Sequence, residues 1–159
     1  VYESAHLISS KRMTEFAEFP MRPEVAPYPR HDELKRYFVE FAEHFGLNER
    51  YEFSTKVVRV QRAPDGGWDV TTQRAGLAQT RRFAGVLIAT GTLHHPFQPA
   101  LPGSFAGTVM HSAQYKSLEQ LRGQRVLVVG CGNSGADIAV DAVRAAASVD
   151  LSVRRGYWF

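Results

Sequence analysis

Three glycines are spaced as G-x-G-x-x-G within the stretch VLVVGCGNSGADIAV, residues 126–140. An apolar run typical of a buried strand precedes them, and a helical pattern follows. In that setting Gly130 permits a tight strand-to-helix turn, Gly132 lets the backbone approach a pyrophosphate, and Gly135 lets the helix pack on the strand. The free amides at the helix start would then face negative charge. The spacing predicts a dinucleotide-binding turn, and a glycine-rich turn that binds nothing is the alternative.

The residues after the next predicted strand indicate which coenzyme such a turn would serve. NAD-specific folds usually carry Asp or Glu about 20 residues beyond the glycine motif, at the ribose. Here the strand is followed by Arg154 and Arg155, and Asp150 lies at its beginning, which is the wrong end. Two guanidiniums suit a 2′-phosphate. The pair predicts NADP(H) in preference to NAD(H), and a solvated basic pair on the surface is the alternative.

Two further patterns carry weaker chemical information. Residues 84–91, AGVLIATG, combine an apolar run with Ala-Thr-Gly, which lets the backbone turn sharply against a close neighbour. Residues 105–115 read F-x-G-x-x-x-H-x-x-x-Y, with His111 as their histidine. No metal-ligand spacing surrounds His111 and no Ser/His/Asp arrangement is readable. The pattern therefore favours a hydrogen-bonded structural histidine over a catalyst, and no metal site is expected.

The elements that must position these motifs follow an α/β pattern. Apolar residues at three- and four-residue spacing predict a helix over residues 32–46, after an irregular segment. Alternating residues then predict an antiparallel β-meander, in which the run 86–89 suits a strand buried on both faces. A proline-rich connector separates the meander from the dinucleotide unit. The predicted strands are 53–62, 68–73 and 82–90, with a turn at 64–67, followed by a strand-bearing lead-in at 105–115, a strand at 126–129, a helix at 133–147 and a strand at 149–153.

Composition limits the classes of partner. The 159 residues are 44% hydrophobic and 22% charged, with a net charge of +3 and scattered basic residues, so no nucleic acid is expected. No apolar run reaches membrane-spanning length. Cys131 is the only cysteine, which suits a reducing compartment, and we expect a cytoplasmic protein. The chain begins and ends inside patterned sequence, so we interpret it as a piece of a longer protein.

These motifs, in this order, resemble the flavin-containing monooxygenases, a family of class B flavoprotein monooxygenases. FAGTVMHSAQY, residues 105–115, fits the family fingerprint F-x-G-x-x-x-H-x-x-x-Y/F at every defined position. VYESAHLISSKRM, EFPMRPEVAPYP and GCGNSGADIA also look like family sequence, so the resemblance covers nearly the whole chain. The related Baeyer–Villiger enzymes end the fingerprint with Trp followed by Pro or Asp. This one ends with Tyr115 and Lys116, which favours the first group.

The resemblance implies a fold and an activity. The fold would have two dinucleotide-binding (Rossmann-like) domains, one for FAD and an inserted one for NADPH. Residues 1–103 would be the later part of the FAD domain, its first βαβ unit missing, and residues 104–159 the fingerprint linker and the start of the NADPH domain. The implied activity is that of an N,N-dimethylaniline monooxygenase, with a small-molecule substrate and O2. NADPH reduces FAD, O2 forms a flavin C4a-hydroperoxide, and a soft nitrogen or sulfur nucleophile takes the distal oxygen.

The resemblance also assigns residues to the two cofactors. The implied NADP set surrounds the glycine motif and the basic pair, and comprises Gly130, Gly132, Asn133, Ser134, Gly135, Ala136, Asp137, Arg154 and Arg155. The implied FAD set comprises Ser9, Val57, Ala89, Thr90 and Gly91.

Ile8 departs from the family pattern. The family usually places an asparagine beside the flavin ring, within the segment that matches residues 7–10, and an ungapped alignment puts Ile8 there. An aliphatic side chain cannot hydrogen-bond the hydroperoxide or NADP⁺. Ile8 therefore leaves an uncoupled NADPH oxidase or flavin reductase as an alternative. Two further alternatives, independent of Ile8, are a Baeyer–Villiger monooxygenase and a non-catalytic NADP-sensing module. No residue is assigned as catalytic.

Overall fold

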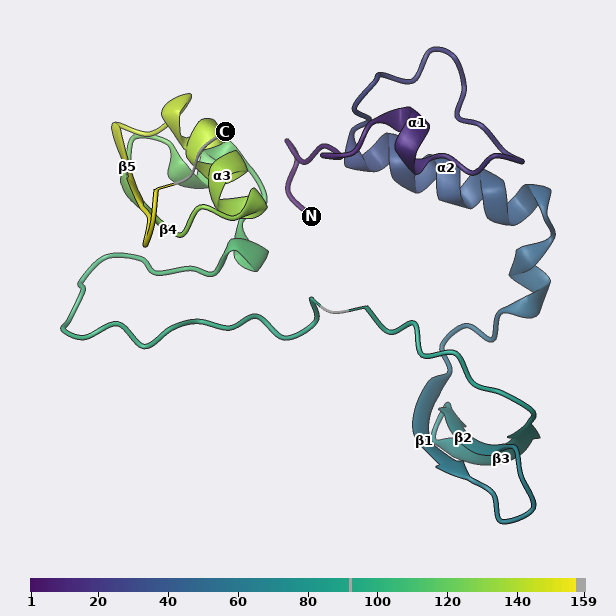
Figure 1. Cartoon of the computed structure of the whole chain (residues 1–159). Coiled ribbons are helices and arrows are strands. Elements are labelled where there is room, and N and C mark those ends of the chain that lie inside the picture. Colours follow the sequence, from purple (N-terminus) through teal and green to yellow (C-terminus); the bar gives the residue numbers. More distant parts are fainter. Residues whose placement is uncertain (92, 157–159) are drawn as a thin grey trace. The chain divides into compact units, whose positions relative to one another are not determined.

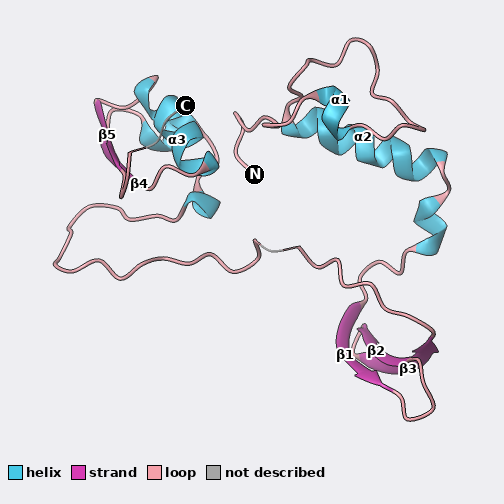
Figure 2. Cartoon of the chain, in the orientation of Figure 1, coloured by secondary structure: helices cyan, strands magenta, loops and turns pink. Residues whose placement is uncertain are grey.

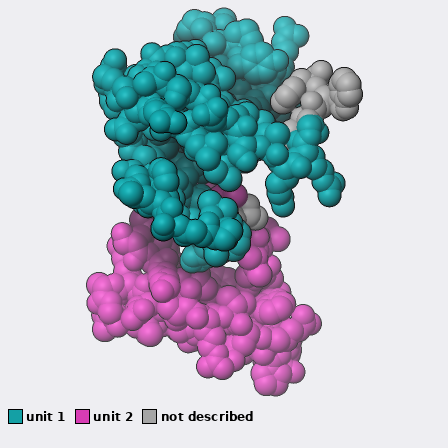
Figure 3. Space-filling model, turned by 90° about the vertical axis from the view of Figure 1, so that its left-hand side faces the viewer, with its two compact units in different colours: residues 1–39, 95–159 teal, residues 40–94 magenta. Residues whose placement is uncertain are grey.

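The structure, a computed structural model, describes residues 1–91 and 93–156. The chain forms two compact units, which Figure 3 shows in different colours. The first unit contains residues 1–39 and the chain from residue 95 onward, and the second unit contains residues 40–94. Helix α2 (His31–His44) begins in the first unit and continues into the second.

Helix α2 confirms the helix that the apolar spacing predicted, and its ends lie within two residues of the predicted bounds. Tyr37, on its apolar face, is 5% exposed. The Tyr37 hydroxyl donates to the Phe19 carbonyl at 2.7 Å and accepts from the Phe16 N–H at 2.8 Å. These bonds tie down the segment before the helix, which is irregular except for the short helix α1 (Lys11–Thr14). Gly46 follows α2 with φ of +60°, the left-handed conformation that ends many helices.

The second unit contains the predicted β-meander (Figures 1 and 2). Its strands pair antiparallel in the order β1-β2-β3, and the predicted turn joins the first two. Gly67 in that turn has φ of +75°, and a Cβ there would lie 2.8 Å from the Phe83 carbonyl oxygen, so the turn requires glycine. The bounds are η1 (Leu47–Arg50), a 3₁₀ turn, and the strands β1 (Lys56–Arg62), β2 (Trp68–Arg74) and β3 (Leu77–Phe83).

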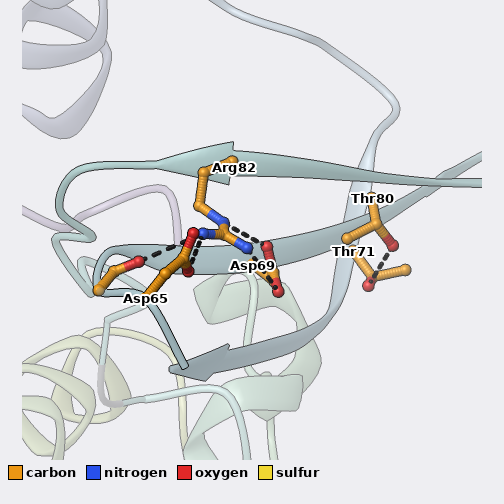
Figure 4. A network of polar contacts seen from close by, with 6 residues as sticks. Asp65, Asp69, Thr71, Thr80 and Arg82 are labelled. Carbon is orange, nitrogen blue, oxygen red and sulfur yellow. Dashed lines mark hydrogen bonds and ion pairs between the residues drawn. The ribbon is translucent and has the colours of Figure 1, made fainter. Parts of the chain in front are cut away.

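Polar side chains connect β3 to the turn between β1 and β2 (Figure 4). Arg82 Nε donates to Asp69 Oδ1 at 2.7 Å, and Arg82 Nη1 donates to Asp65 Oδ1 at 2.5 Å. The hydrogen bond from Arg82 holds the pKa of the Asp65 carboxyl below its ordinary value. On the same sheet the hydroxyls of Thr71 and Thr80 hydrogen-bond at 2.8 Å. Because these contacts are solvent exposed, we expect them to contribute little to stability.

Two strand predictions are wrong. The third strand of the meander covers residues 77–83 instead of 82–90, and residues 84–91 form no strand. Leu87 is 97% exposed and Ile88 is 82% exposed, so the run is not buried on both faces. Residues 105–115 contain no strand either, only the 3₁₀ turn η2 (Ser112–Gln114). An extended run becomes a strand only by hydrogen bonding to a neighbour, and neither sheet among the described residues reaches these segments.

The first unit contains the predicted strand–turn–helix–strand arrangement (Figure 1). Strands β4 (Arg125–Val129) and β5 (Ser148–Ser152) pair in parallel, and helix α3 (Asn133–Val143) connects them. The helix ends four residues earlier than predicted. Beyond Val143 the chain turns, with the Ala145 N–H donating to the Ala142 carbonyl at 3.0 Å, and the Ala147 N–H then donates to the Gln124 carbonyl at 2.8 Å just before β5.

A small buried cluster packs α3 against the segment that precedes β4. Tyr115, Leu121 and Ala142 are its buried members, and Leu121 ends the 3₁₀ turn η3 (Leu118–Leu121). The parallel strands with their connecting helix, together with the antiparallel meander, confirm the mixed α/β class. Across the part of the chain that the structure describes, no helix has both the length and the apolar character to cross a membrane.

Candidate functional site

The glycine turn lies at the carboxyl end of the parallel strand pair. Gly130 directly follows β4 and has φ of +103°, a conformation that side chains rarely adopt. Its N–H donates to the Ser152 carbonyl at 2.9 Å, so the turn is anchored to the end of β5. The turn then enters α3. A glycine motif of this spacing is a candidate dinucleotide-binding turn when it follows a strand and opens a helix, as it does here.

The other two glycines of the motif have different surroundings. A Cβ on Gly135 would overlap the Gly130 carbonyl oxygen and lie 3.0 Å from the carbonyl carbon. The helix start can therefore come this close to the turn only because residue 135 has no side chain. A Cβ on Gly132 would meet no atom of this chain within 4 Å. The packing of the protein therefore requires Gly135 to be glycine but leaves the space beside Gly132 open. That open space suits a ligand that comes close to the backbone.

The start of α3 is suited to binding an anion. Gly132 is the N-cap, and no side chain caps the helix. The first intrahelical bond runs from the Ala136 N–H to the Gly132 carbonyl at 2.9 Å, so the amides of residues 133–135 precede the hydrogen-bonded ladder. Asn133 and Ser134 are exposed. Amides of this kind, together with the positive end of the helix dipole, attract phosphate groups.

The basic pair lies at the same edge of the sheet. Val129 pairs with Ser152, so the carboxyl ends of β4 and β5 coincide. Arg154 and Arg155 follow two and three residues after that end, and both are exposed. The sequence predicts Asp150 at the beginning of its strand, but it is the central residue of β5 and pairs with Leu127. Asp150 therefore lies away from the carboxyl edge, as the coenzyme prediction requires. The edge thus combines a glycine turn, free amides and two guanidiniums.

Asp137, assigned to the NADP set, faces a partner that the sequence did not indicate. Its Oδ2 accepts a hydrogen bond from the Tyr2 hydroxyl at 2.6 Å. Burial, followed by the bond to Asp137, raises the pKa of Tyr2 to about 12. One helical turn further on, Asp141 Oδ2 accepts from Tyr115 at 2.9 Å and also from Ser4. Tyr115 belongs to the sequence fingerprint, but no local pattern pairs Tyr2 or Ser4 with α3, because 135 and 137 residues separate the partners.

His111 makes hydrogen bonds with its immediate neighbours. Its Nδ1 accepts from the Ala113 N–H at 3.1 Å, and its own N–H donates to Gln114 Oε1 at 2.8 Å. Together these bonds form a capping box around η2. The histidine therefore fixes the turn that leads into Tyr115.

The residues assigned to FAD lie in both units of the chain. Ser9, in the first unit, hydrogen-bonds Thr14 through its hydroxyl at 2.8 Å, and its neighbour Ile8 is 75% exposed. Val57 lies on β1 at a register irregularity and is 54% exposed. Residues 89–91 follow β3 as irregular, exposed chain, and Gly91 has φ of +74°. Whereas the NADP set gathers around one edge of one sheet, the FAD set is divided between the units.

Comparison with known proteins identifies relatives over the whole chain. Residues 1–159 match the protein-family model described as flavin-binding monooxygenase-like. The chain is 39% identical over 166 aligned residues to dimethylaniline monooxygenase (N-oxide-forming) 4 from Homo sapiens, covering 99% of this chain and 30% of that protein. It is 36% identical to flavin-containing monooxygenase 5 from Oryctolagus cuniculus, covering 99% of this chain and 31% of that protein.

The fold also matches a solved structure. The S-allyl-L-cysteine S-oxygenase from Allium sativum superposes with a TM-score of 0.86 at 26% identity, covering 98% of this chain and 38% of that one. The chain therefore spans about a third of the length of the proteins that it matches.

Proposed function

Because the chain belongs to the flavin-binding monooxygenase-like family, we propose that it forms part of a flavoprotein monooxygenase that uses NADPH, FAD and O2. Its substrates are small molecules with a soft nitrogen or sulfur atom. The names of the relatives support this class, since one forms an N-oxide and another is an S-oxygenase. In this proposal residues 1–103 belong to the FAD-binding domain, and residues 104–159 form the linker and the start of the NADPH-binding domain.

One observation carries the proposal: the carboxyl edge of β4 and β5 presents a glycine turn and two arginines together. The open space beside Gly132 and the uncapped amides of α3 fit a pyrophosphate. Arg154 and Arg155 fit the 2′-phosphate that distinguishes NADPH from NADH. Asp150 lies in the middle of its strand, so no carboxylate of β5 would repel that phosphate at the carboxyl edge.

The residues of this chain bind and orient the cofactors. Amides of residues 133–135 would hold the pyrophosphate, and the guanidinium of Arg154 would hold the 2′-phosphate, so that the dinucleotide would be bound at two points. When bound, the flavin supplies the redox chemistry, accepting hydride and activating O2. Ser9, Val57 and residues 89–91 are assigned to the FAD site by resemblance to the family. Their contribution would be contact with the flavin.

The decisive experiment is the coenzyme preference of an Arg154→Ala variant in the protein that carries this chain. We expect the KM for NADPH to rise about tenfold or more while the KM for NADH changes little, because only the 2′-phosphate contact is lost. Arg74→Ala, which removes an exposed arginine from β2 in the second unit, is the matched control. Equal losses with NADPH and NADH would contradict the assignment, as would a parent protein that prefers NADH.

Ile8 favours a second candidate, an NADPH oxidase that releases H2O2 instead of oxygenating a substrate. An aliphatic side chain supplies no hydrogen-bond donor at the place where the family usually has asparagine. The amount of H2O2 released per NADPH oxidised, with a good amine or sulfide present, separates the two functions. A ratio near one supports the oxidase, and a ratio near zero supports the monooxygenase.

A further inference from the structure

The first five residues form a strap that contacts the middle of α3; we call residues 1–5 the N-terminal strap. Tyr2 donates its hydroxyl proton to Asp137, and Ser4 donates to Asp141. Between them, the Glu3 N–H donates to the Lys116 carbonyl at 2.8 Å. The Tyr2 ring also packs against the Tyr115 ring, with centroids 5.7 Å apart. Side-chain and backbone contacts thus hold the strap against both the fingerprint segment and the helix.

These contacts supply hydrogen bonds to the carboxylate of Asp141, whose burial without donors would destabilise the fold. Asp141 is 3% exposed, and a buried carboxylate requires hydrogen-bond donors. Tyr115, which is 1% exposed, donates one hydrogen bond and Ser4 donates another to the same oxygen, Oδ2. The Arg144 guanidinium lies 3.7 Å from the other oxygen, Oδ1. The strap therefore supplies part of the hydrogen bonding that Asp141 needs, so its docking affects how α3 is held.

The strap also connects α3 to the segment that carries Ile8 and Ser9. Beyond Tyr2 and Ser4, the chain pairs with residues 29–31: the Leu7 N–H donates to the Pro29 carbonyl at 2.9 Å, and the His31 N–H donates to the Ala5 carbonyl at 3.1 Å. One continuous stretch of ten residues therefore has α3 at one end and Ile8 and Ser9 at the other. The helix that it contacts begins at the glycine turn of the dinucleotide site.

We propose that Tyr2 and Ser4 are positioning residues for the dinucleotide site, and that NADP⁺ binding and strap docking stabilise each other. This inference rests on the proposed function, because it takes the glycine turn as the site of the dinucleotide pyrophosphate. The contacts that carry this role run from Tyr2 and Ser4 to α3. Their hydroxyls act through Asp137 and Asp141, one helical turn apart, to hold the orientation of the helix start.

Linkage makes the proposal quantitative. If docking of the strap raises the affinity for NADP⁺ by some factor, then saturating NADP⁺ must favour the docked strap by the same factor. Couplings between sites are commonly about fivefold or more. We therefore expect a Tyr2→Phe, Ser4→Ala double variant to bind NADP⁺ about fivefold more weakly than the parent. In the parent, saturating NADP⁺ should slow hydrogen exchange at the Glu3 N–H by a similar factor.

The experiment uses NADP⁺ as the probe and the protein that carries this chain. Calorimetry gives the Kd of the parent, of the double variant, and of Tyr28→Phe, which removes the hydroxyl of a 56% exposed tyrosine as a matched control. Hydrogen exchange is measured on the parent with and without NADP⁺, so this arm does not depend on the folding of a variant. Restoring a hydroxyl with Ser4→Thr in place of Ser4→Ala should recover part of the affinity.

The outcomes separate the inference from the function on which it rests. A double variant that melts at a lower temperature but binds NADP⁺ like Tyr28→Phe would show that the strap is only structural. Unchanged exchange at the Glu3 N–H in saturating NADP⁺ would overturn the coupling as well. A parent that does not bind NADP⁺ refutes the proposed function together with the coupling, whereas a parent that binds it with no effect of the strap refutes the coupling alone.

Discussion

The close contact between Gly135 and the glycine turn predicts that Gly135→Ala destabilises the protein, whereas helix propensity predicts the opposite. Alanine is a better helix former than glycine by about 1 kcal/mol, so propensity alone predicts that Gly135→Ala stabilises the protein. In the structure, however, the new Cβ overlaps the Gly130 carbonyl oxygen and lies 3.0 Å from its carbon. Both are backbone atoms and cannot rotate away. To reach ordinary contact at 3.4 Å, the Gly130 carbonyl carbon would have to move about 0.4 Å away from the new Cβ, and the oxygen would have to move further.

The energetic consequence can be bounded. Overpacking a well-packed site costs about 1–3 kcal/mol, and a backbone neighbour favours the upper end. After the gain in helix propensity is subtracted, a net loss of about 2 kcal/mol remains. In a domain of about 150–250 residues a loss of this size corresponds to a fall in Tm of about 4–8 °C. The displaced helix start should also bind NADP⁺ more weakly.

Gly132→Ala is the matched variant, because it adds the same methyl group three residues earlier in the motif. Its Cβ meets nothing within 4 Å, so we expect Tm to fall by less than about 4 °C, as for alanine at an N-cap. If the open space is occupied by the pyrophosphate, the Kd for NADP⁺ should nevertheless rise about tenfold or more.

Thermal melting and calorimetry with NADP⁺ on both variants test the reasoning. A Gly135→Ala protein that melts at or above the parent temperature would refute the steric argument. A Gly132→Ala protein that binds NADP⁺ within about twofold of the parent would refute the position of the pyrophosphate.

Three further changes test other parts of the structure. Tyr115→Phe removes a hydrogen bond from the buried carboxylate of Asp141, and we expect a loss of about 1.5–3 kcal/mol in the free energy of unfolding, measured by urea denaturation. The pKa of Tyr2 is raised from 10.0 to about 12, so the unfolded state releases that proton first and stability should fall as pH rises from about 10 to 12; Tyr2→Phe should flatten this part of the pH–stability curve. Ile8→Asn restores a side chain that can hydrogen-bond, and we expect less H2O2 per NADPH oxidised than in the parent; an increase would show that the alignment or the reasoning about Ile8 is wrong.

Features that depend on neighbours in sequence were predictable. The spacing of apolar residues predicted α2, and Gly67 with its neighbours predicted the turn between the first two strands. The glycine motif predicted the tight turn from β4 into α3, and the positive φ of Gly130 is the conformation through which the chain makes it. Each of these follows from backbone sterics and side-chain periodicity within a few residues. The proximity of the glycine motif and Arg154 was predictable too, because neighbouring parallel strands have their carboxyl ends at the same edge of the sheet.

Features that depend on which distant segments meet were decided only by the tertiary structure. The apolar run at residues 86–89 has strand-like composition, but no described strand pairs with it, so it remains exposed and irregular. Tyr2 and Ser4, which hydrogen-bond Asp137 and Asp141, belong to the N-terminal strap and lie 135 and 137 residues away from them in sequence. Local patterns show that a residue is polar or apolar, whereas hydrogen bonding and burial depend on the neighbour that folding brings to it. The sequence therefore determined the glycine turn itself, and the tertiary structure determined what holds its helix in place.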